Sequence, residues 1–326
     1  MSTIRNLSPL TATLLVLGLI VLLAPLFFPS AYYFRIGTLV FINGLAVIGL
    51  VILIGYAGQV SLGHAGFSGI GAYACAIGPA HFGLPPVLCI LIGAALSASL
   101  AWLAGRPILR LKGHYLAVAT LGFGILISMV LNNEAQWTGG PDGMTVEALG
   151  LKAALKAMGL KLKTSVVWYW FSGLVLLIGA WLALNLYDSP SGRALRSLHD
   201  SEVAASVVGV DVARYKLTAF VVSAVYASLA GSLLALFNKF VTPDIAGFLH
   251  SIELVTMAVL GGAGSVLGGI LGAALLTALP QALTLFHEYE HLLLGLIMML
   301  VMIFLRQGLL PGLQAALTAT RRRRPA

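Results

Sequence analysis

Long apolar runs without charges recur along this sequence and constrain its fold more than any other feature. A run of about 18 or more such residues is long enough to cross the hydrocarbon core of a bilayer as a helix. Hydrophobic residues make up 59% of the chain and its mean hydropathy is +0.98, whereas soluble domains are about 45–50% apolar. We therefore expect an all-α fold, a polytopic transmembrane helical bundle.

The apolar segments are separated by glycine, proline or charged residues. The first is expected to remain as a helix, because it lacks a small-x-small cleavage site and is followed by a proline-rich turn. The segments lie at Leu10–Phe28, Ile36–Ile54, Ser61–Ile77, Leu84–Ala104, Tyr115–Leu131, Ser165–Leu186, Leu217–Phe240, Ile252–Leu285 and His291–Leu305.

Three groups of basic residues predict the orientation of the bundle. They lie at 106–112, in the loop 187–216 and in the tail 306–326, and the positive-inside rule favours all three in the cytoplasm. This holds if the N-terminus is inside and Ile252–Leu285 breaks at Gly261–Gly264. The consistent count is about ten crossings, with Gly-broken or half helices among them and both termini cytoplasmic. Residues 1–326 then form a single transmembrane domain.

The loop 132–164 is external in this count, although it carries four lysines. Its stretch Leu149–Leu160 has Leu151, Leu155 and Met158 at helical spacing, which predicts a short amphipathic helix. Such a helix either rests on the lipid interface or docks an external partner.

The cytoplasmic loop 187–216 is the most polar internal part of the chain. About a quarter of its residues are charged, against 9% overall. It includes a short run of small residues from Glu202 to Gly209. We expect a loop of this kind to present itself to a partner in the water.

Two glycine-rich stretches, 55–71 and 261–272, show five further identical pairs when Gly55 is set on Gly261. Paired Gly-broken segments point to a translocation site, and small residues also serve tight helix packing. The first stretch adds Gln59, Ser61 and His64, polar groups that favour a pathway role; the second adds Ser265.

Two other polar residues interrupt apolar segments. Asn43 lies in the middle of one, and Glu253 opens the Gly-broken one. Intramembrane polar groups usually face a cavity or a partner, although Glu253 could equally sit at the water interface in a first helical turn. The candidate translocation-pathway residues are therefore Asn43, Gln59, Ser61, His64, Glu253 and Ser265.

The sequence contains no recognisable catalytic or metal-binding constellation. Cys75 and Cys89 lie inside apolar runs without metal-ligand spacing. A phosphate-binding Gly-x-x-x-x-Gly-Lys-Ser/Thr loop is absent, since the chain has no Gly-Lys pair. We expect no enzyme, no metal and no cofactor bound by this chain, so ATP, if used, is bound by a partner subunit. The basic residues set topology, and no nucleic acid is expected.

Several motifs resemble one protein family from about Phe41 to Leu310. They are Gly55-Tyr-Ala-Gly-Gln-Val-Ser-Leu-Gly-His-Ala-Gly-Phe, Tyr115-Leu-Ala-Val-Ala-Thr-Leu-Gly-Phe-Gly, Thr138-Gly-Gly-Pro-Asp-Gly, Gly192-Arg-Ala-Leu-Arg with Glu202-Val-Ala-Ala, Ala213-Arg-Tyr-Lys-Leu-Thr-Ala-Phe and Gly261-Gly-Ala-Gly-Ser-Val-Leu-Gly. The chain resembles the permease subunit of branched-chain amino acid ABC importers, the longer of the two paired permeases. Permeases of urea or short amides are similar.

The resemblance implies a heteromeric importer in the bacterial cytoplasmic (inner) membrane. Its other parts are a second homologous permease, two cytoplasmic ABC ATPases and a periplasmic or extracellular solute-binding protein. The family resemblance also implies a Glu-Ala-Ala-x-x-x-Gly coupling helix: Ala204, Ala205 and Gly209 fit it, while Glu202 lies one residue further upstream.

These residues suggest how transport is coupled to ATP hydrolysis. Small side chains at Ala204 and Ala205 allow the helix to enter a groove on the ATPase, with Arg193 and Arg196 as a polar rim. A stand-alone secondary transporter is the alternative, but it needs paired acidic or cation-binding residues in the membrane, and Glu253 is the one candidate. The residues do not distinguish a zwitterionic amino acid from urea.

Overall fold

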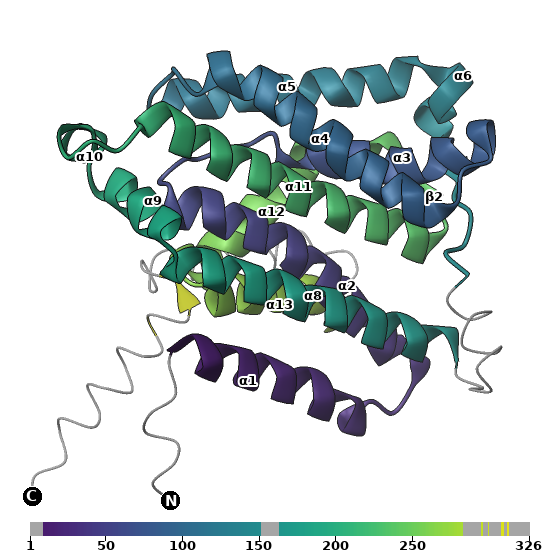
Figure 1. Cartoon of the computed structure of the whole chain (residues 1–326). Coiled ribbons are helices and arrows are strands. Elements are labelled where there is room, and N and C mark those ends of the chain that lie inside the picture. The colour runs from purple at the N-terminus through teal and green to yellow at the C-terminus, as the bar shows by residue number, and fades with distance from the viewer. Residues whose placement is uncertain are drawn as a thin grey trace, which may run out of the picture.

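A computed structural model describes residues 9–150 and 163–282, together with the isolated positions 295, 299, 308, 309 and 312. The described part is a bundle of helices that lie side by side, and most of them run from one end to the other (Figure 1). The predicted helical bundle is confirmed, apart from a two-residue antiparallel strand pair, β1 with β2.

The elements follow one another in a simple order along the chain. The first half contains α1 (Pro9–Leu23), η2 (Ala24–Phe27), α2 (Ala31–Leu50), η3 (Val51–Tyr56), α3 (His64–Phe82), α4 (Pro86–Ile108), α5 (His114–Asn133), α6 (Ala135–Thr138), η4 (Gly140–Asp142) and β1 (Met144–Thr145). The second half contains α8 (Thr164–Asp188), α9 (Pro190–Asp200), α10 (Glu202–Val207), α11 (Val212–Asn238), β2 (Phe240–Val241), η5 (Pro243–Ala246), α12 (Phe248–Gly261) and α13 (Val266–Ala282).

The predicted apolar segments correspond to helices wherever the structure describes them. Within that part of the chain, five helices are long and apolar enough to cross a membrane, namely α2 with η3, α4, α5, α8 and α11. Shorter apolar helices lie at Thr13–Phe27, Phe248–Gly261 and Val266–Gln281. The predicted final segment and basic tail, and most of the predicted amphipathic helix at Leu149–Leu160, lie outside the described residues.

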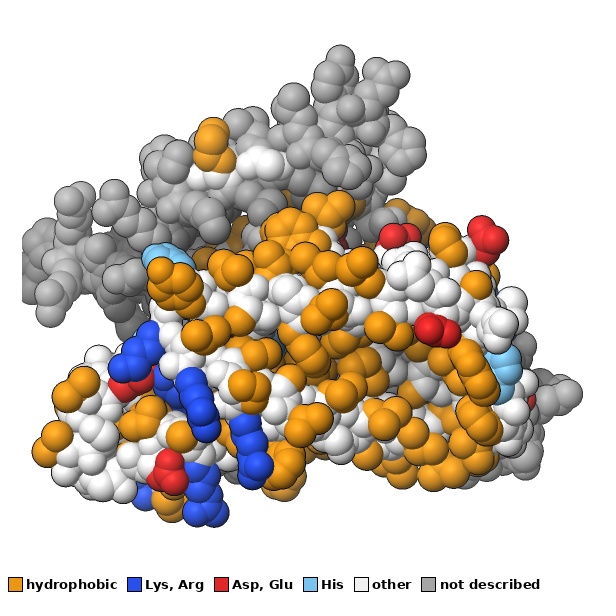
Figure 2. Space-filling view, turned by 90° about the horizontal axis from the view of Figure 1, so that it is seen from above, with side chains coloured by type: hydrophobic (Ala, Val, Ile, Leu, Met, Phe, Trp, Pro, Cys, Tyr) orange, Lys and Arg blue, Asp and Glu red, His pale blue; other side chains and the backbone are white. Residues whose placement is uncertain are grey.

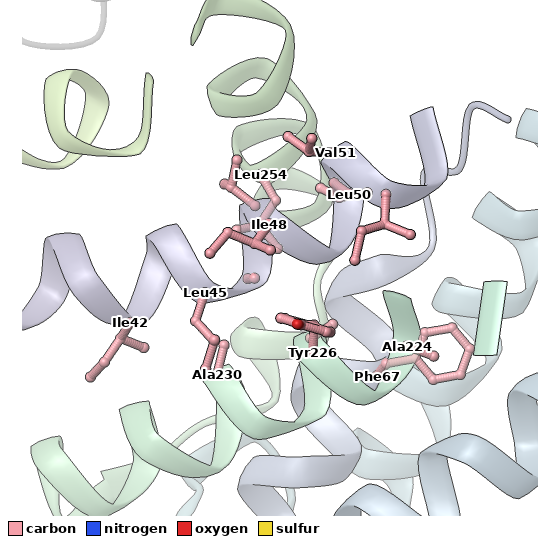
Figure 3. Packing of buried hydrophobic residues seen from close by; sticks show 14 of the residues in the cluster. Ile42, Leu45, Ile48, Leu50, Val51, Phe67, Ala224, Tyr226, Ala230 and Leu254 are labelled. Atoms are coloured by element: carbon pink, nitrogen blue, oxygen red, sulfur yellow. The ribbon is translucent and has the colours of Figure 1, made fainter. Parts of the chain in front are cut away.

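Helices α2 and α11 form the core of the bundle. The C-terminal half of α2 is buried on nearly all sides, as is typical of a helix that is hydrophobic all round. Small residues of α11, including Ala224 and Ala230, are also buried. They allow α2, α3 and α4 to approach closely, and Figure 3 shows Ala230 and Tyr226 facing Leu45 and Ile48 of α2.

Helices α4 and α5 lie at the periphery. They expose large apolar side chains along their outer faces, among them Leu96, Leu103, Val118 and Leu126. Figure 2 shows this apolar surface covering much of one face of the molecule. Because an exposed apolar surface of this extent is unfavourable in water, the outer faces of these two helices are suited to contact lipid.

Helix α3 begins inside the bundle, not at its end. Its first residue, His64, is fully buried and contacts Ser223, which lies near the middle of α11. The preceding non-helical segment starts near α9, where Gly58 lies against His199. Helix α3 therefore starts three residues after the first residue of the expected apolar segment Ser61–Ile77, because the chain first runs inward through this non-helical segment.

The two glycine-rich stretches meet in space. The predicted break at Gly261–Gly264 is confirmed as the turn between α12 and α13, which pack against each other as a hairpin. A Cβ built on Gly55 would lie 1.8 Å from the carbonyl oxygen of Ala263. The break after α2 thus touches the break between α12 and α13, and only a residue without a side chain fits at Gly55.

The polar regions of the chain lie at opposite ends of the bundle (Figure 1). Helices α9 and α10 are at one end, while α6 and β2 are at the other, and α8 runs from one to the other. The end that carries α9 and α10 is called the coupling end below. The described part of the predicted loop 132–164 and the predicted loop 187–216 therefore fall at opposite ends of the helices that span the bundle.

Candidate functional site

Helix α9 is fixed firmly to the coupling end. Ser189 caps it by accepting a hydrogen bond from the Gly192 N–H at 3.1 Å, and Pro190 occupies the first turn, where no N–H is needed. Leu195 and Leu198 are buried against the bundle. The helix is amphipathic, so one face packs on the protein and the other faces water.

The two predicted rim arginines help to hold α9 in place. Arg193 donates a hydrogen bond from Nη1 to the carbonyl oxygen of Asp188 at 3.1 Å. The guanidinium of Arg196 lies 3.8 Å from the ring centroid of Tyr187, a cation–π arrangement, and Tyr187 in turn contacts Tyr56. Both arginines therefore bind the end of α8, and Arg196 links α9 to η3 through two aromatic rings.

Helix α10 is short and presents an apolar surface to water. Ser201 caps it, accepting a hydrogen bond from the Ala204 N–H at 3.3 Å. Val203, Val207 and Val208 are 71%, 81% and 75% exposed. Three neighbouring valines on a loop otherwise rich in charge form an unusual patch, and exposed apolar patches mark contacts with another protein or with a membrane. We call these three residues the valine patch.

One ion pair joins α10 to α11. Glu202, the first residue of α10, binds the ammonium of Lys216 through its carboxylate. The Lys216 side chain is 5% exposed and that of Glu202 is 37% exposed. A buried ammonium without a counter-charge costs free energy of folding. The ion pair with Glu202 offsets this cost for Lys216. The pair thus ties the start of α10 to the first turns of α11.

Gly209 follows α10 in a backbone conformation that other residues avoid. Its φ angle is +87°, its N–H donates to the Ser206 carbonyl, and no atom lies within 4 Å of an added Cβ. A glycine is thus favoured here because of its positive φ angle, and not because a side chain would collide with neighbouring atoms.

The predicted coupling residues lie together, but not all of them face water. Ala204 is exposed, whereas Ala205 is buried and faces the bundle. The expectation that both alanines enter a partner's groove is therefore wrong for Ala205, because the helix turns that position inward. The valine patch was missed by sequence reasoning, although three valines around an Ala-Ala pair in a polar loop were a usable signal.

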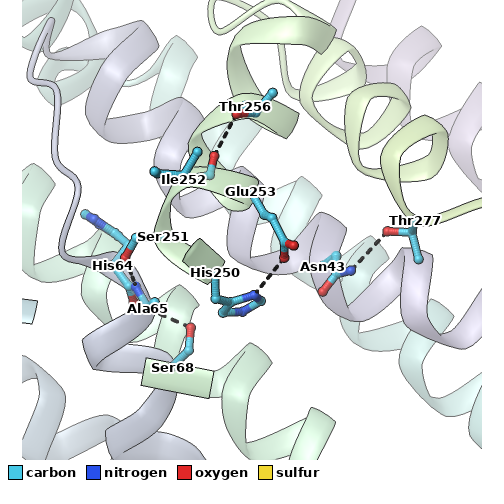
Figure 4. Close-up of polar contacts among 10 residues, drawn as sticks. All are labelled: Asn43, His64, Ala65, Ser68, His250, Ser251, Ile252, Glu253, Thr256 and Thr277. Atoms are coloured by element: carbon cyan, nitrogen blue, oxygen red, sulfur yellow. Dashed lines mark hydrogen bonds and ion pairs between the residues drawn. The ribbon is translucent and has the colours of Figure 1, made fainter. Parts of the chain in front are cut away.

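His64 is the centre of a polar cluster in the bundle interior. Its Nδ1 lies 2.9 Å from Ser61 Oγ and its Nε2 lies 2.6 Å from Ser223 Oγ. The Ala65 N–H donates to Ser251 Oγ at 3.1 Å, and Figure 4 shows this contact beside the imidazole. The cluster joins the start of α3 to α11 and α12.

Gln59 lies in the same non-helical segment and is 3% exposed. Its side-chain amide nitrogen and oxygen have no hydrogen-bond partner among the described residues. Buried amides normally have partners, so this one is available to a water molecule, to a substrate or to a group that approaches during a conformational change. Ser61, His64 and Gln59 are the predicted residues that the structure brings near one another.

The other three predicted pathway residues lie elsewhere. Asn43 donates from Nδ2 to Thr277 Oγ1 at 3.0 Å and joins α2 to α13 (Figure 4). Ser265 caps α13 by accepting from the Gly268 N–H at 3.3 Å. Glu253 lies 3.3 Å from His250 with its side chain 65% exposed. It borders a hollow of about 360 Å³ that also includes Asp244.

Sequence reasoning missed the partners that complete the interior cluster. Ser223 and Ser251 are fully or almost fully buried, and Thr120 accepts a hydrogen bond from the Leu62 N–H at 3.1 Å. Each is a small hydroxyl residue in an apolar helix. Such residues commonly look like ordinary packing residues, so only their contacts reveal the cluster.

We expect His64→Leu to destabilise the protein by about 1–3 kcal/mol, because it leaves the hydroxyls of Ser61 and Ser223 buried without their partner. Thermal unfolding of the purified chain in detergent measures this effect. His114→Leu, at an exposed position, is the matched control and should change little. Equal melting temperatures for wild type and His64→Leu would show that the cluster contributes no stability.

Comparison with known proteins gives one consistent result. The family model described as "Branched-chain amino acid transport system / permease component" matches residues 32–302. The high-affinity branched-chain amino acid transport system permease protein LivM of Escherichia coli K12 is 36% identical over 294 residues, covering 85% of this chain and 69% of the relative.

Shorter similarities extend to other permeases. The permease protein LivH of Salmonella typhimurium LT2 is 28% identical, covering 55% of this chain and 57% of its own length. The autoinducer 2 import system permease protein LsrC of Enterobacter sp. 638 is 33% identical, covering 47% of this chain and 41% of its own. No solved structure matches the chain significantly. The chain belongs to the family of branched-chain amino acid transport system permease components.

Proposed function

We propose that this chain is one of two different permease subunits of an ATP-driven importer of branched-chain amino acids. Its family membership and its similarity to LivM support a transport role without catalysis. The separate similarity to LivH supports a second, related permease as its partner. The observation that carries the coupling role is the valine patch on α10, an apolar surface at the coupling end.

The energy source in this proposal is a pair of separate ATPase subunits. The chain itself has no phosphate-binding loop. An ATPase groove with an apolar floor would accept the valine patch, and the charged residues of the loop would surround that contact. A solute-binding protein delivers the substrate at the opposite end. No bound cofactor or metal is assigned to this chain.

The proposed orientation places the coupling end in the cytoplasm of a bacterium, with the chain in its inner membrane. The basic groups at 106–112 and 187–216 both lie at this end, as the positive-inside rule favours. Ten crossings with both termini cytoplasmic remain the proposed count. The single permease domain would then present loop 132–164 outside and loop 187–216 and tail 306–326 inside.

Coupling proceeds through helices that are packed against one another. ATPase closure displaces α10, and the Glu202–Lys216 pair passes the displacement to α11. Helix α11 packs extensively on α3 and α2, so its movement reaches the start of α3. There the His64 cluster and the unpartnered amide of Gln59 lie at the non-helical segment. Irregular backbone at this depth is a feature of transport pathways.

Val207→Asp tests the docking role most directly. Val207 is 81% exposed, so a carboxylate there should not disturb the fold, but it would be placed against the proposed apolar groove. We expect uptake by the reconstituted importer to fall about 100-fold, in line with the loss of a central interface residue. Uptake of radiolabelled leucine into proteoliposomes and co-purification of the ATPases are the two measurements.

The control must place the same charge at an exposed position that does not face lipid, which excludes a residue such as Val118 on the outer face of α5. Ser206→Asp, on the same helix as Val207 and also exposed, introduces the same charge beside the patch and should have a smaller effect. If Val207→Asp retains both the ATPases and normal uptake, the valine patch is not the docking surface.

A urea or short-amide permease of the same family is the second candidate substrate class. Competition with leucine uptake separates the two. Unlabelled isoleucine or valine in excess should abolish leucine uptake, while urea and acetamide should not. Uptake of labelled urea without leucine uptake would assign the chain to the amide-type permeases.

A further inference from the structure

A groove at the coupling end is formed by the last turns of α4 and the first turns of α10 and α11. Its volume is about 950 Å³. Five basic residues line it, with two acidic ones: Arg106, Arg110, Lys112, Arg214 and Lys216, with Glu202 and Asp211. Figure 2 shows the basic side chains gathered at this end, next to the apolar surface of the bundle. We call it the basic groove.

Both acidic residues of the basic groove are already engaged. Glu202 pairs with Lys216. Asp211 caps α11 and accepts a hydrogen bond at Oδ1 from the Arg214 N–H at 3.0 Å. Among the described residues, Arg106, Arg110 and Lys112 have no carboxylate within ion-pairing distance. The groove thus has an excess of exposed positive charge, which favours binding of an anion.

The apolar wall of the groove continues into the lipid-facing surface of α4. Leu100, Trp102 and Leu103 are exposed along that helix. The Arg106 guanidinium lies 3.6 Å from the ring centroid of Trp102, so an aromatic residue and a basic residue meet at the level where the apolar face ends. Tryptophan and arginine at such a boundary are typical of the interface between lipid tails and headgroups.

We propose that the basic groove binds the headgroup of an anionic phospholipid of the cytoplasmic leaflet. The phosphate would lie among Arg106, Arg110 and Lys112, and the acyl chains would lie along α4. Basic pockets beside transmembrane helices are suited to this chemistry. Because Glu202 and Val203 form the opposite wall, a bound lipid would touch the coupling helix. This consequence rests on the proposed function, whereas lipid binding itself does not.

The test is lipid binding by the purified full-length chain in detergent, measured by native mass spectrometry. Phosphatidylglycerol and phosphatidylcholine of equal chain length are the probes. We expect phosphatidylglycerol to bind at least 10-fold more tightly. Arg106→Gln with Arg110→Gln should weaken it about 25-fold, since each basic residue near an anionic lipid contributes about five-fold. Arg35→Gln, an exposed arginine of α2 outside the groove, should leave binding within two-fold.

Three results would overturn the proposal. The first is equal binding of the two lipids by the wild-type chain. The second is equal weakening by Arg35→Gln and by Arg106→Gln with Arg110→Gln. The third is binding of water-soluble glycerophosphoglycerol as tight as that of the lipid, which would assign the groove to a soluble phosphate compound. Leucine uptake is not needed for either measurement, so a failure of the proposed transport function would be seen separately.

Discussion

Gly231→Val is expected to leave no stably folded permease. A Cβ at this position of α11 would lie 1.9 Å from the carbonyl oxygen of Ser68 in α3. The reverse contact is equally close, because a Cβ at Gly71 would lie 2.0 Å from the carbonyl oxygen of Ser228. The two backbones touch at both points. A valine would force apart two backbones that already touch, at a cost above about 3 kcal/mol.

Fluorescence-detected size exclusion and thermal unfolding in detergent measure this effect. Gly18→Val is the matched control, because no atom lies within 4 Å of a Cβ added there. It should behave as the wild type. Gly231→Ala should already lower the melting temperature, since the Cβ itself collides. A folded Gly231→Val protein that melts within about 3 °C of the wild type would show that α3 and α11 do not touch as described.

The helical segments were predictable because a bilayer demands long apolar stretches. Segments such as Tyr115–Leu131 and Ser165–Leu186 differ from α5 and α8 by one or two residues at each end. The break at Gly261–Gly264 was predictable as well, because glycines there favour a turn. What the pattern could not show is that α3 starts inside the bundle, since a buried non-helical segment and a helix end have similar composition.

The orientation of individual side chains was less accessible to sequence reasoning. Ala205 was expected at a partner interface and is buried, because a six-residue helix has no clear period to define its faces. Contacts between distant residues were also hidden. His64 and Ser223 are 159 positions apart, and nothing in either local sequence pairs them. Membrane helices bury small hydroxyl residues for several reasons, so Ser223 looked like an ordinary packing residue.

The Glu202–Lys216 pair was not predicted either, although both residues were visible as charges of one loop. Glu202 departs by one residue from the position that the family resemblance implies for its motif. In the structure this carboxylate binds a lysine of the same chain. The departure thus has a physical explanation: Glu202 fixes α10 on α11, while Val203, Val207 and Val208 stay exposed.

Breaking this pair is expected to uncouple ATP hydrolysis from uptake. Glu202→Gln leaves the almost fully buried Lys216 ammonium without its counter-charge. Because Glu202 is more than one-third exposed, water offsets part of the loss, and we expect a destabilisation of about 2 kcal/mol. We also expect about 10-fold lower uptake at nearly unchanged ATPase activity, since a loosened α10 absorbs the ATPase movement without passing it on.

The double variant Glu202→Gln with Lys216→Met separates stability from coupling. Replacing a buried charge pair by neutral groups often restores stability, so the melting temperature should return close to that of the wild type. Uptake in proteoliposomes should stay low, because the tie between α10 and α11 is still missing. Asp200→Asn neutralises an exposed carboxylate at the end of α9. This control should keep both the melting temperature and the uptake rate of the wild type. Normal uptake by the double variant would mean that packing alone, and not the ion pair, carries the movement from α10 to α11.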